Sequence, residues 1–293
     1  MFHHRFPVAL AHGKVLLFTL LISLSFPIGS ALTAALCFVV LLTGQRKLVL
    51  PSWRDLGRYT LICLPALCYF VAMFVALQET SALDASALYT TVPLISALAG
   101  MVIMRKPIGL WTGLALMGGM VAAALIIFRG DLGQLASLKL TASNRLYLLG
   151  CVAMALNPIV VKCCYRGESF VHLTCWTLIC ASVLLTLVTA PRLLAADWQA
   201  VTLPLWLGMG YLALFATALS FFLFQQGSVA LRPEQVSAYT FLIPVLVLLC
   251  DRWLGSAIPW QQVGGGIAGV LIAMGVMVWA PARGTVRTQT GTG

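Results

Sequence analysis

Charged side chains are scarce in this chain of 293 residues, where Lys, Arg, Asp and Glu together make up 9% of the sequence. Hydrophobic residues make up 61% of it. A soluble globular domain carries about 25% charged and about 45–50% apolar residues, and a fold this poor in charge could not cover its surface with polar groups. The composition therefore excludes a cytosolic enzyme, a secreted disulfide scaffold and a disordered chain. It indicates a polytopic integral membrane protein.

Acidic residues are the scarcer charged type, and none of the 8 falls near the middle of a long apolar run. An ionisable group inside a membrane span marks an ion or proton pathway by default. Because the spans lack such carboxylates, we expect no carboxylate proton relay. Any transport would then be uncoupled or would depend on another group.

Patterns that would hold a metal or a cofactor are also missing. The 9 cysteines are odd in number, lie almost all inside apolar runs and form no Cys-x-x-Cys pair in a loop. A free cysteine in such a run packs as a small hydrophobic residue, so neither disulfides nor a metal site are predicted. The glycine-rich stretches 118–119 and 264–266 follow no strand, which argues against a nucleotide-binding loop. We therefore assign no catalytic residue, cofactor or metal.

What the chain does contain is a series of apolar runs of about 20 residues, the length that crosses a bilayer core of about 30 Å. The runs are continuous, whereas a membrane-spanning strand would alternate polar and apolar residues within a closed barrel. The sequence therefore predicts an all-α integral membrane protein. Eight spans are expected at roughly 59–77, 85–104, 108–128, 145–165, 169–190, 203–224, 235–254 and 262–280.

The first apolar run, residues 15–43, is 29 residues long. That length is long for one crossing and short for two, which need about 40 residues and a turn. Basic residues flank both ends, and two crossings place 13 of the 18 basic residues in the cytoplasm, as the positive-inside rule prefers. We therefore expect a multi-pass protein of the cytoplasmic (inner) membrane with both termini in the cytoplasm. A cleavable signal peptide remains an alternative.

The net charge of +10 is explained by the excess of basic residues in the loops expected on the cytoplasmic side, so no nucleic-acid partner is expected.

Two segments about 150 residues apart read alike. Residues 86–93 and 237–244 both begin with Ser-Ala and end with proline, and Gly113 and Gly264 each stand twenty residues after those prolines. An odd number of helices in each copy makes the two copies inverted in the membrane. Inverted repeats of this kind place a binding site at their interface near the bilayer midplane.

The order of these motifs resembles the EamA-type permeases of the drug/metabolite transporter superfamily. Residues 25–29 (SFPIG) resemble the first-helix motif of that family, residues 76–82 (ALQETSA) the end of its third helix, and residues 217–219 (TAL) its eighth. The resemblance covers about residues 15–280. It implies a 5+5 inverted-repeat helix bundle of about 9–10 transmembrane helices.

On this resemblance the domains are a first EamA-like repeat at 15–128, a second at 145–280 and a polar C-terminal tail at 281–293. The chain departs from the family pattern near residues 33–34, where the loop after helix 1 and the first half of helix 2 are missing. The arginine usual in that stretch is absent too. This shortened helix 1–2 region leaves transport competence open, because helix 1 is expected to line the substrate path.

Asn157 and Pro158 form the most informative polar pair. Proline removes a backbone hydrogen bond, and an amide side chain in lipid must find a partner, so the pair predicts a broken helix lining a cavity, with plain helix packing as the alternative. Lys162 is the deepest cation and would contact a solute carboxylate or else snorkel to the interface. Gln225 and Gln226 end an expected helix and are predicted to face the loop.

Tyrosines offer stacking faces and hydroxyls for a cavity wall, although they also suit the membrane interface. The two that precede the repeat prolines carry most weight, and the prolines themselves are expected to bend their helices as gating kinks, a role implied by the resemblance. The candidate substrate-cavity residues are Tyr69, Tyr89, Pro93, Asn157, Pro158, Lys162, Tyr211, Thr217, Tyr239 and Pro244.

The leading functional hypothesis is transport of a small organic solute, such as an amino acid, metabolite or drug, by alternating access. Export is favoured by the resemblance alone, and facilitated diffusion is the other mode. The expected partners are that solute and the lipid bilayer, with a homodimer left open. The alternatives are a truncated paralogue that does not transport and a membrane enzyme acting on a lipid-linked substrate.

Overall fold

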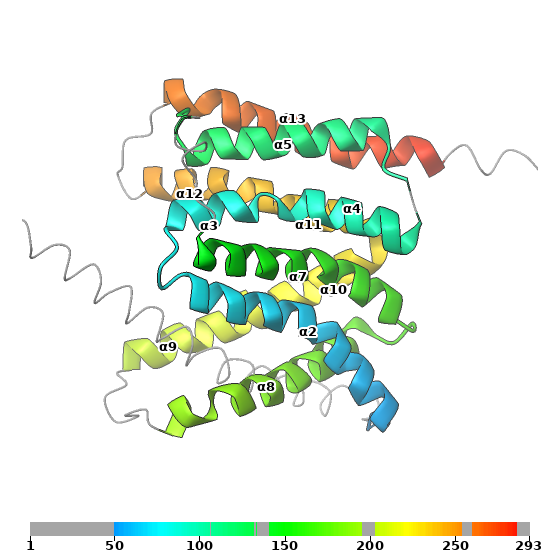
Figure 1. Ribbon diagram of the computed structural model, residues 1–293. Coiled ribbons are helices and arrows are strands. Elements are labelled where there is room, and N and C mark those ends of the chain that lie inside the picture. The colour runs from blue at the N-terminus through cyan, green and yellow to red at the C-terminus, as the bar shows by residue number, and fades with distance from the viewer. Residues whose placement is uncertain are drawn as a thin grey trace, which may run out of the picture. The chain divides into compact units, whose positions relative to one another are not determined.

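The computed structural model describes residues 50–105, 107–131, 133, 141–194, 203–253 and 260–285. Within these ranges the regular structure is entirely helical (Figure 1). Seven helical segments of the described residues are long and apolar enough to cross a membrane, and the expected span at 203–224 is not among them. The predicted all-α membrane fold is thereby confirmed for this part of the chain, while the first apolar run and the shortened region near residues 33–34 lie outside it.

Every apolar run from residue 59 onward contains helix, although three runs are divided into shorter segments. One division contains a π-helical stretch, η2, and another a 3₁₀ turn, η3. The bounds are α2 Trp53–Ala76, α3 Ala82–Tyr89, α4 Val92–Met104, α5 Leu110–Ile127, α7 Ala142–Cys164, α8 Phe170–Leu194, α9 Leu203–Tyr211, η2 Leu212–Leu219, α10 Ser220–Ala230, α11 Pro233–Ser237, η3 Ala238–Phe241, α12 Leu242–Trp253 and α13 Trp260–Thr285.

The chain divides into two compact units. Unit 1 comprises residues 1–67 and 164–226, and unit 2 comprises residues 68–163 and 227–293. The boundaries fall inside α2 and α10 and just before the last residue of α7, so the units do not coincide with the two sequence repeats. Unit 2 therefore contains segments of both repeats.

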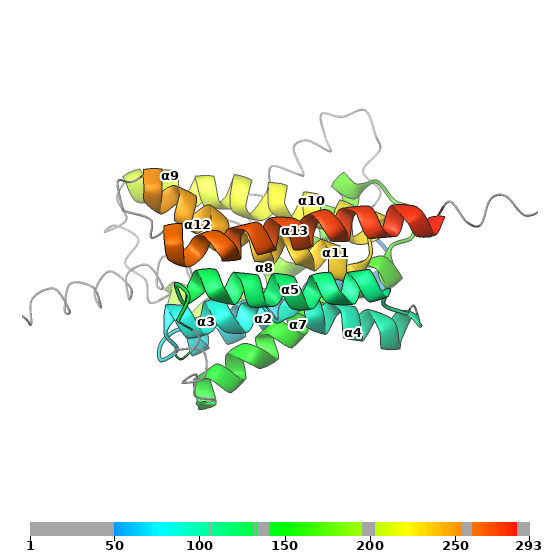
Figure 2. The ribbon, with the colours of Figure 1, turned by 90° about the horizontal axis from the view of Figure 1, so that it is seen from above.

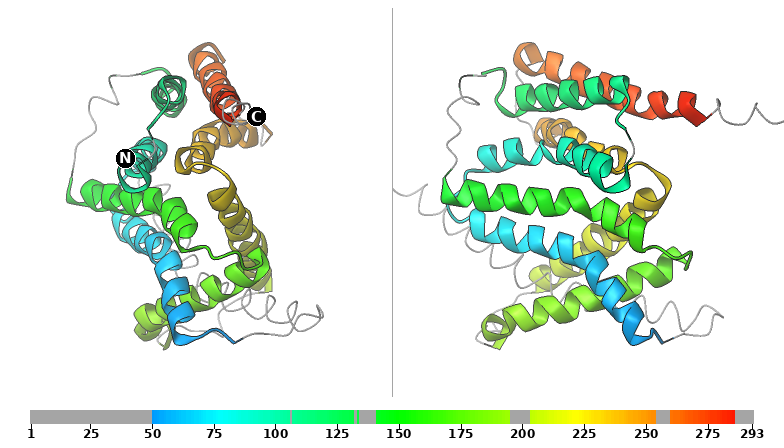
Figure 3. Two further views of the ribbon diagram at one scale, coloured as in Figure 1. Left: turned by 90° about the vertical axis from the view of Figure 1, so that its right-hand side faces the viewer. Right: turned by 45° about the vertical axis from the view of Figure 1, so that its right-hand side comes forward.

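The core of unit 2 is the contact between α5 and α13, which run side by side in every view (Figure 1, Figure 2 and Figure 3). Leu116 on α5 and Val270 on α13 are completely buried. A Cβ atom on Gly266 would lie 2.8 Å from the Ala122 carbonyl oxygen, and one on Gly269 would lie 2.7 Å from the Ala122 Cβ. Small residues let the two backbones approach closely, which is how helices associate in lipid.

The helices are interrupted just before the two repeat prolines. Between α3 and α4, the hydroxyls of Thr90 and Thr91 each donate a 2.6 Å hydrogen bond to the carbonyl three residues earlier. Pro93 then stands in the first turn of α4. Pro244 is the third residue of α12, the helix that begins directly after η3. Proline is tolerated there because the first N–H groups of a helix have no intrahelical acceptor. The prolines were predicted to bend their helices, but the structure has a break before each proline instead.

The helix that contains Pro158 is not broken there, contrary to the prediction. α7 continues as one helix from Ala142 to Cys164 with Pro158 inside it, so the predicted broken segment is not seen. α7 packs closely in unit 2, since a Cβ on Gly150 would lie 2.9 Å from the Cβ of Ala72. Packing of neighbouring helices against a proline-bearing helix can hold it as one element even where a backbone bond is lost.

Unit 1 contains a partly buried ionic cluster near the start of α2. The Nη1 atom of Arg58 lies 2.6 Å from Oε1 of Glu168 and also donates to the carbonyl of Cys164 at 2.9 Å. The Nη2 atom of Arg58 donates to the hydroxyl of Tyr59 at 3.1 Å. The side chains of Arg58 and Glu168 are 9% and 14% exposed. These contacts tie α2 to the turn between α7 and α8.

Candidate functional site

A cavity of about 440 Å³ in unit 2 is large enough to hold a small molecule. Ligand pockets typically measure about 300–1,000 Å³. Its wall combines an apolar surface with hydroxyl groups and one arginine. The lining residues are Leu77, Ala85, Ser86, Tyr89, Thr90, Ile126, Ile127, Arg129, Tyr147, Thr240, Ile243, Pro244, Val247 and Leu248.

Both sequence repeats contribute matching residues to this wall. Tyr89 and Thr240 each precede their repeat proline by four residues, and both line the cavity. Because proline has no N–H, neither carbonyl receives the hydrogen bond that a helix would supply from four residues later. The hydroxyl of Thr240 is also buried and has no hydrogen-bond partner in the described part of the chain. An unpaired buried hydroxyl on a cavity wall is suited to bind a polar group of a ligand.

Four tyrosines gather beside the cavity. The hydroxyls of Tyr69 and Tyr147 lie 3.4 Å apart, and the ring centroids of Tyr69 and Tyr89 are separated by 5.4 Å. Tyr89 also shares a side-chain hydrogen bond with Tyr239. Three of the four predicted tyrosines are thus brought together. Tyr147 was not predicted, although its place one helical turn before Gly150 could have marked the close helix contact on this face.

The end of α5 fixes the position of Arg129 at the cavity. The N–H of Gly130 donates to the Leu125 carbonyl at 2.9 Å, and that of Arg129 donates to the Ile126 carbonyl at 3.2 Å. These two bonds define a Schellman cap, in which glycine usually takes the left-handed position. Arg129 takes it here with φ 51°, a conformation that costs a residue with a Cβ about 1–2 kcal/mol. Backbone strain of this kind clusters at functional sites.

The other predicted site residues lie elsewhere in their units. In unit 2, Asn157 and Pro158 are buried within α7 and do not belong to the cavity lining, and Pro93 is buried at the start of α4. In unit 1, Tyr211 is 63% exposed and its ring packs on a neighbouring phenylalanine, whereas Thr217 is buried in the π-helical stretch.

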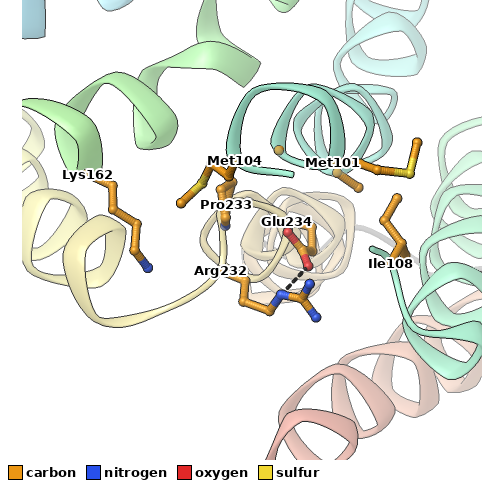
Figure 4. A pocket seen from close by; sticks show the side chains of 9 residues that line it. Met101, Met104, Ile108, Lys162, Arg232, Pro233 and Glu234 are labelled. Carbon is orange, nitrogen blue, oxygen red and sulfur yellow. Dashed lines mark ion pairs between the residues drawn. The ribbon is translucent and has the colours of Figure 1, made fainter. Parts of the chain in front are cut away.

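Lys162 lines a second, much smaller pocket in unit 2, of about 20 Å³ (Figure 4). Its ammonium group donates to the Leu231 carbonyl at 2.6 Å. Arg232 pairs with Oε1 of Glu234 at 3.0 Å and donates to the Pro107 carbonyl at 2.8 Å. A space of this size holds about one water molecule, so it cannot take an organic solute.

Gln225 belongs to a buried polar pair in unit 1, contrary to the prediction for this residue. The residue was predicted to face the loop, but it is 1% exposed, and its Oε1 accepts a 2.6 Å hydrogen bond from the hydroxyl of Thr174. Its Nε2 has no partner among the described residues. The sequence placed Gln225 near a helix end, but only the packing of α8 against α10 decides that this side chain points inward.

Replacing Thr174 with valine is expected to lower the free energy of unfolding by about 1–3 kcal/mol, because it leaves a buried amide oxygen unpaired. Thermal unfolding of the detergent-purified protein, followed by tryptophan fluorescence, measures the change. The double variant Thr174→Val/Gln225→Leu removes both partners and should recover most of the loss. Equal destabilisation of the single and double variants would show that the hydrogen bond is not the reason.

Comparison with known proteins gives a consistent family assignment. The model of the EamA-like transporter family matches residues 14–128 and again residues 144–278. A curated protein of Bacillus subtilis (strain 168), the uncharacterized transporter YyaM, is 22% identical over 259 residues, which are 87% of this chain and 84% of that protein. A solved crystal structure is similar with a TM-score of 0.65 at 15% identity, covering 88% of this chain and 87% of that one. That likeness shows the fold alone.

Proposed function

Because the chain belongs to the EamA-like transporter family and is a multi-pass membrane protein, we propose that it moves a small organic solute across the membrane by alternating access. The observation that carries the proposal is the cavity lined by the matching residues Tyr89 and Thr240 of the two repeats. In inverted-repeat transporters the solute binds where the repeats meet, often beside interrupted helices. The breaks before Pro93 and Pro244 supply such interruptions here.

The same proposal includes the place of the protein in the cell. We infer the cytoplasmic membrane, with both termini in the cytoplasm, from the excess of basic residues in the loops assigned to that side. Export as the direction rests on the family resemblance alone. A homodimer stays a prediction, which the mass of the purified protein in detergent would test.

Saturable flux in proteoliposomes tests the proposed function. We expect the purified protein to carry at least one solute from a panel of amino acids, nucleosides, monocarboxylates and cationic dyes, without any need for a proton gradient. Substituting Ser86 with tryptophan should reduce the flux about tenfold or more, because Ser86 is an exposed residue of the cavity wall and the indole would occupy the space.

Val121→Trp is the matched control for that experiment. Val121 is 51% exposed on α5 and does not belong to the cavity lining, so this variant should transport as the parent protein does. Absence of flux for every solute class, from protein shown to be folded, would contradict the proposal and favour the truncated paralogue. Unchanged flux in Ser86→Trp would place the solute path elsewhere.

A further inference from the structure

We propose that the cavity selects amphipathic solutes that carry a carboxylate on an apolar body and no ammonium group, with Arg129 as the residue that determines this specificity. The inference rests on the proposed function and narrows the class of its substrate. It follows from the charges that line the cavity, from the backbone that holds Arg129 and from the apolar part of the wall.

Arg129 is the one charged residue among those that line the cavity, and no carboxylate accompanies it. A guanidinium binds a carboxylate through strong charge-assisted hydrogen bonds. An ammonium group entering the same space would lose its water without gaining a counter-ion, which makes its burial unfavourable. The unpaired hydroxyl of Thr240 adds a second donor for an anion.

Two acidic residues from neighbouring helix ends lie outside the lining, and each accepts a hydrogen bond from a neutral side chain. The amide of Asn144 donates to Oδ2 of Asp84 at 3.5 Å, and the hydroxyl of Ser143 donates to Oε2 of Glu79. Neither Asp84 nor Glu79 belongs to the cavity lining. The charge among the lining residues is therefore positive.

The backbone of Arg129 fixes the residue at the end of α5, on the wall of the cavity. A Schellman cap is formed most easily with glycine in the left-handed position, and Gly130 follows directly. An arginine there adds strain, which its favourable interaction with the helix dipole partly offsets. Arg105 takes the same conformation at the end of α4 with φ 53°, so it is the place of Arg129 in the cavity lining that carries the inference.

The rest of the wall sets the shape of the solute. Leu77, Ile127, Ile243, Val247 and Leu248 supply branched aliphatic side chains to a space of about 440 Å³. Contact with such a surface favours an apolar body the size of a branched alkyl chain or a single aromatic ring.

Binding of three molecules of one shape tests the proposal. Isocaproate has the carboxylate alone, isoamylamine has the ammonium alone, and leucine has both on the same branched chain. Isothermal titration calorimetry on the detergent-purified full chain at neutral pH should show isocaproate binding at least tenfold more tightly than leucine. Isoamylamine should not bind measurably. Equal or tighter binding of leucine or isoamylamine would overturn the inference.

Arg129→Gly is the decisive variant, because glycine suits the left-handed cap while removing the charge. We expect isocaproate affinity to fall at least tenfold while the unfolding temperature stays the same or rises. Arg129→Lys should keep part of the affinity, and Arg145→Gln, which removes an exposed arginine of α7 outside the lining, should keep all of it. Undiminished isocaproate binding in Arg129→Gly would overturn the role of Arg129.

The two proposals fail in distinguishable ways. If no solute class shows flux and none of the three molecules binds, the proposed function itself is contradicted. If the flux panel finds a carried solute while isocaproate does not bind, transport stands and the inferred solute class is wrong.

Discussion

Gly266→Ala is expected to lower the free energy of unfolding by about 2–3 kcal/mol, although it adds a single methyl group. That methyl would lie 2.7 Å from Cγ1 of Ile126 and 2.8 Å from the carbonyl oxygen of Ala122. A flexible side chain could move aside, but the carbonyl belongs to the backbone of α5, so α5 and α13 would have to separate. Overpacking of a close contact typically costs about 1–3 kcal/mol.

The same substitution at Gly275 provides the control within one helix. A Cβ at Gly275 has no neighbouring atom within 4 Å, so Gly275→Ala should leave stability unchanged or raise it by up to about 1 kcal/mol through helix propensity. Unfolding by SDS titration in mixed micelles, followed by circular dichroism, measures both variants. Equal effects at the two glycines would contradict the close contact between α5 and α13.

Arg58→Met is expected to lower the free energy of unfolding by about 1–3 kcal/mol, because it leaves the partly buried carboxylate of Glu168 with the backbone N–H of Arg166 but without its guanidinium partner. The pair is joined at 2.6 Å, and the Arg58 guanidinium also lies 4.7 Å from the centroid of the Tyr59 ring. Thermal unfolding in detergent, followed by tryptophan fluorescence, should show this loss of stability. The double variant Arg58→Met/Glu168→Met, which removes both charges of the pair, should lose less stability than the single one.

Arg166→Met is the matched control for the partly buried Arg58–Glu168 pair. Arg166 is 65% exposed and lies 3.5 Å from Asp55, so its loss should cost about 0–1 kcal/mol. A similar small cost for Arg58→Met would mean that water reaches the Arg58–Glu168 pair and screens it.

The helical spans could be predicted from the sequence because the lipid interior offers no hydrogen-bond partners to the backbone. A backbone in hydrocarbon must satisfy its own hydrogen bonds, so each continuous apolar run of sufficient length becomes a helix. The repeat could be predicted for a similar reason, since Pro93 and Pro244 act locally on the chain. The structure places both at the start of a helix after a break.

The candidate site could be predicted only in part. Tyr89 and Tyr239 were found through the repeat, and the structure brings them together with Tyr69. Arg129 carried no sequence pattern of its own, and Tyr147 had only its place one helical turn before Gly150. Tyr147 reaches the cluster because the close approach at Gly150 brings α7 against α2, and Arg129 reaches the cavity because of the cap that ends α5.

By itself, the sequence determined the membrane environment, the all-helical fold and the duplicated organisation, because these depend on composition, run length and spacing along one chain. Only the tertiary structure decided which face of each helix is buried. Gln225 shows the difference, since an amide near a helix end can face either way and α8 supplies the partner that draws it inward. The cavity belongs to the same class of property, because its wall is assembled from α3, α5, α7, η3 and α12, whose packing no single segment encodes.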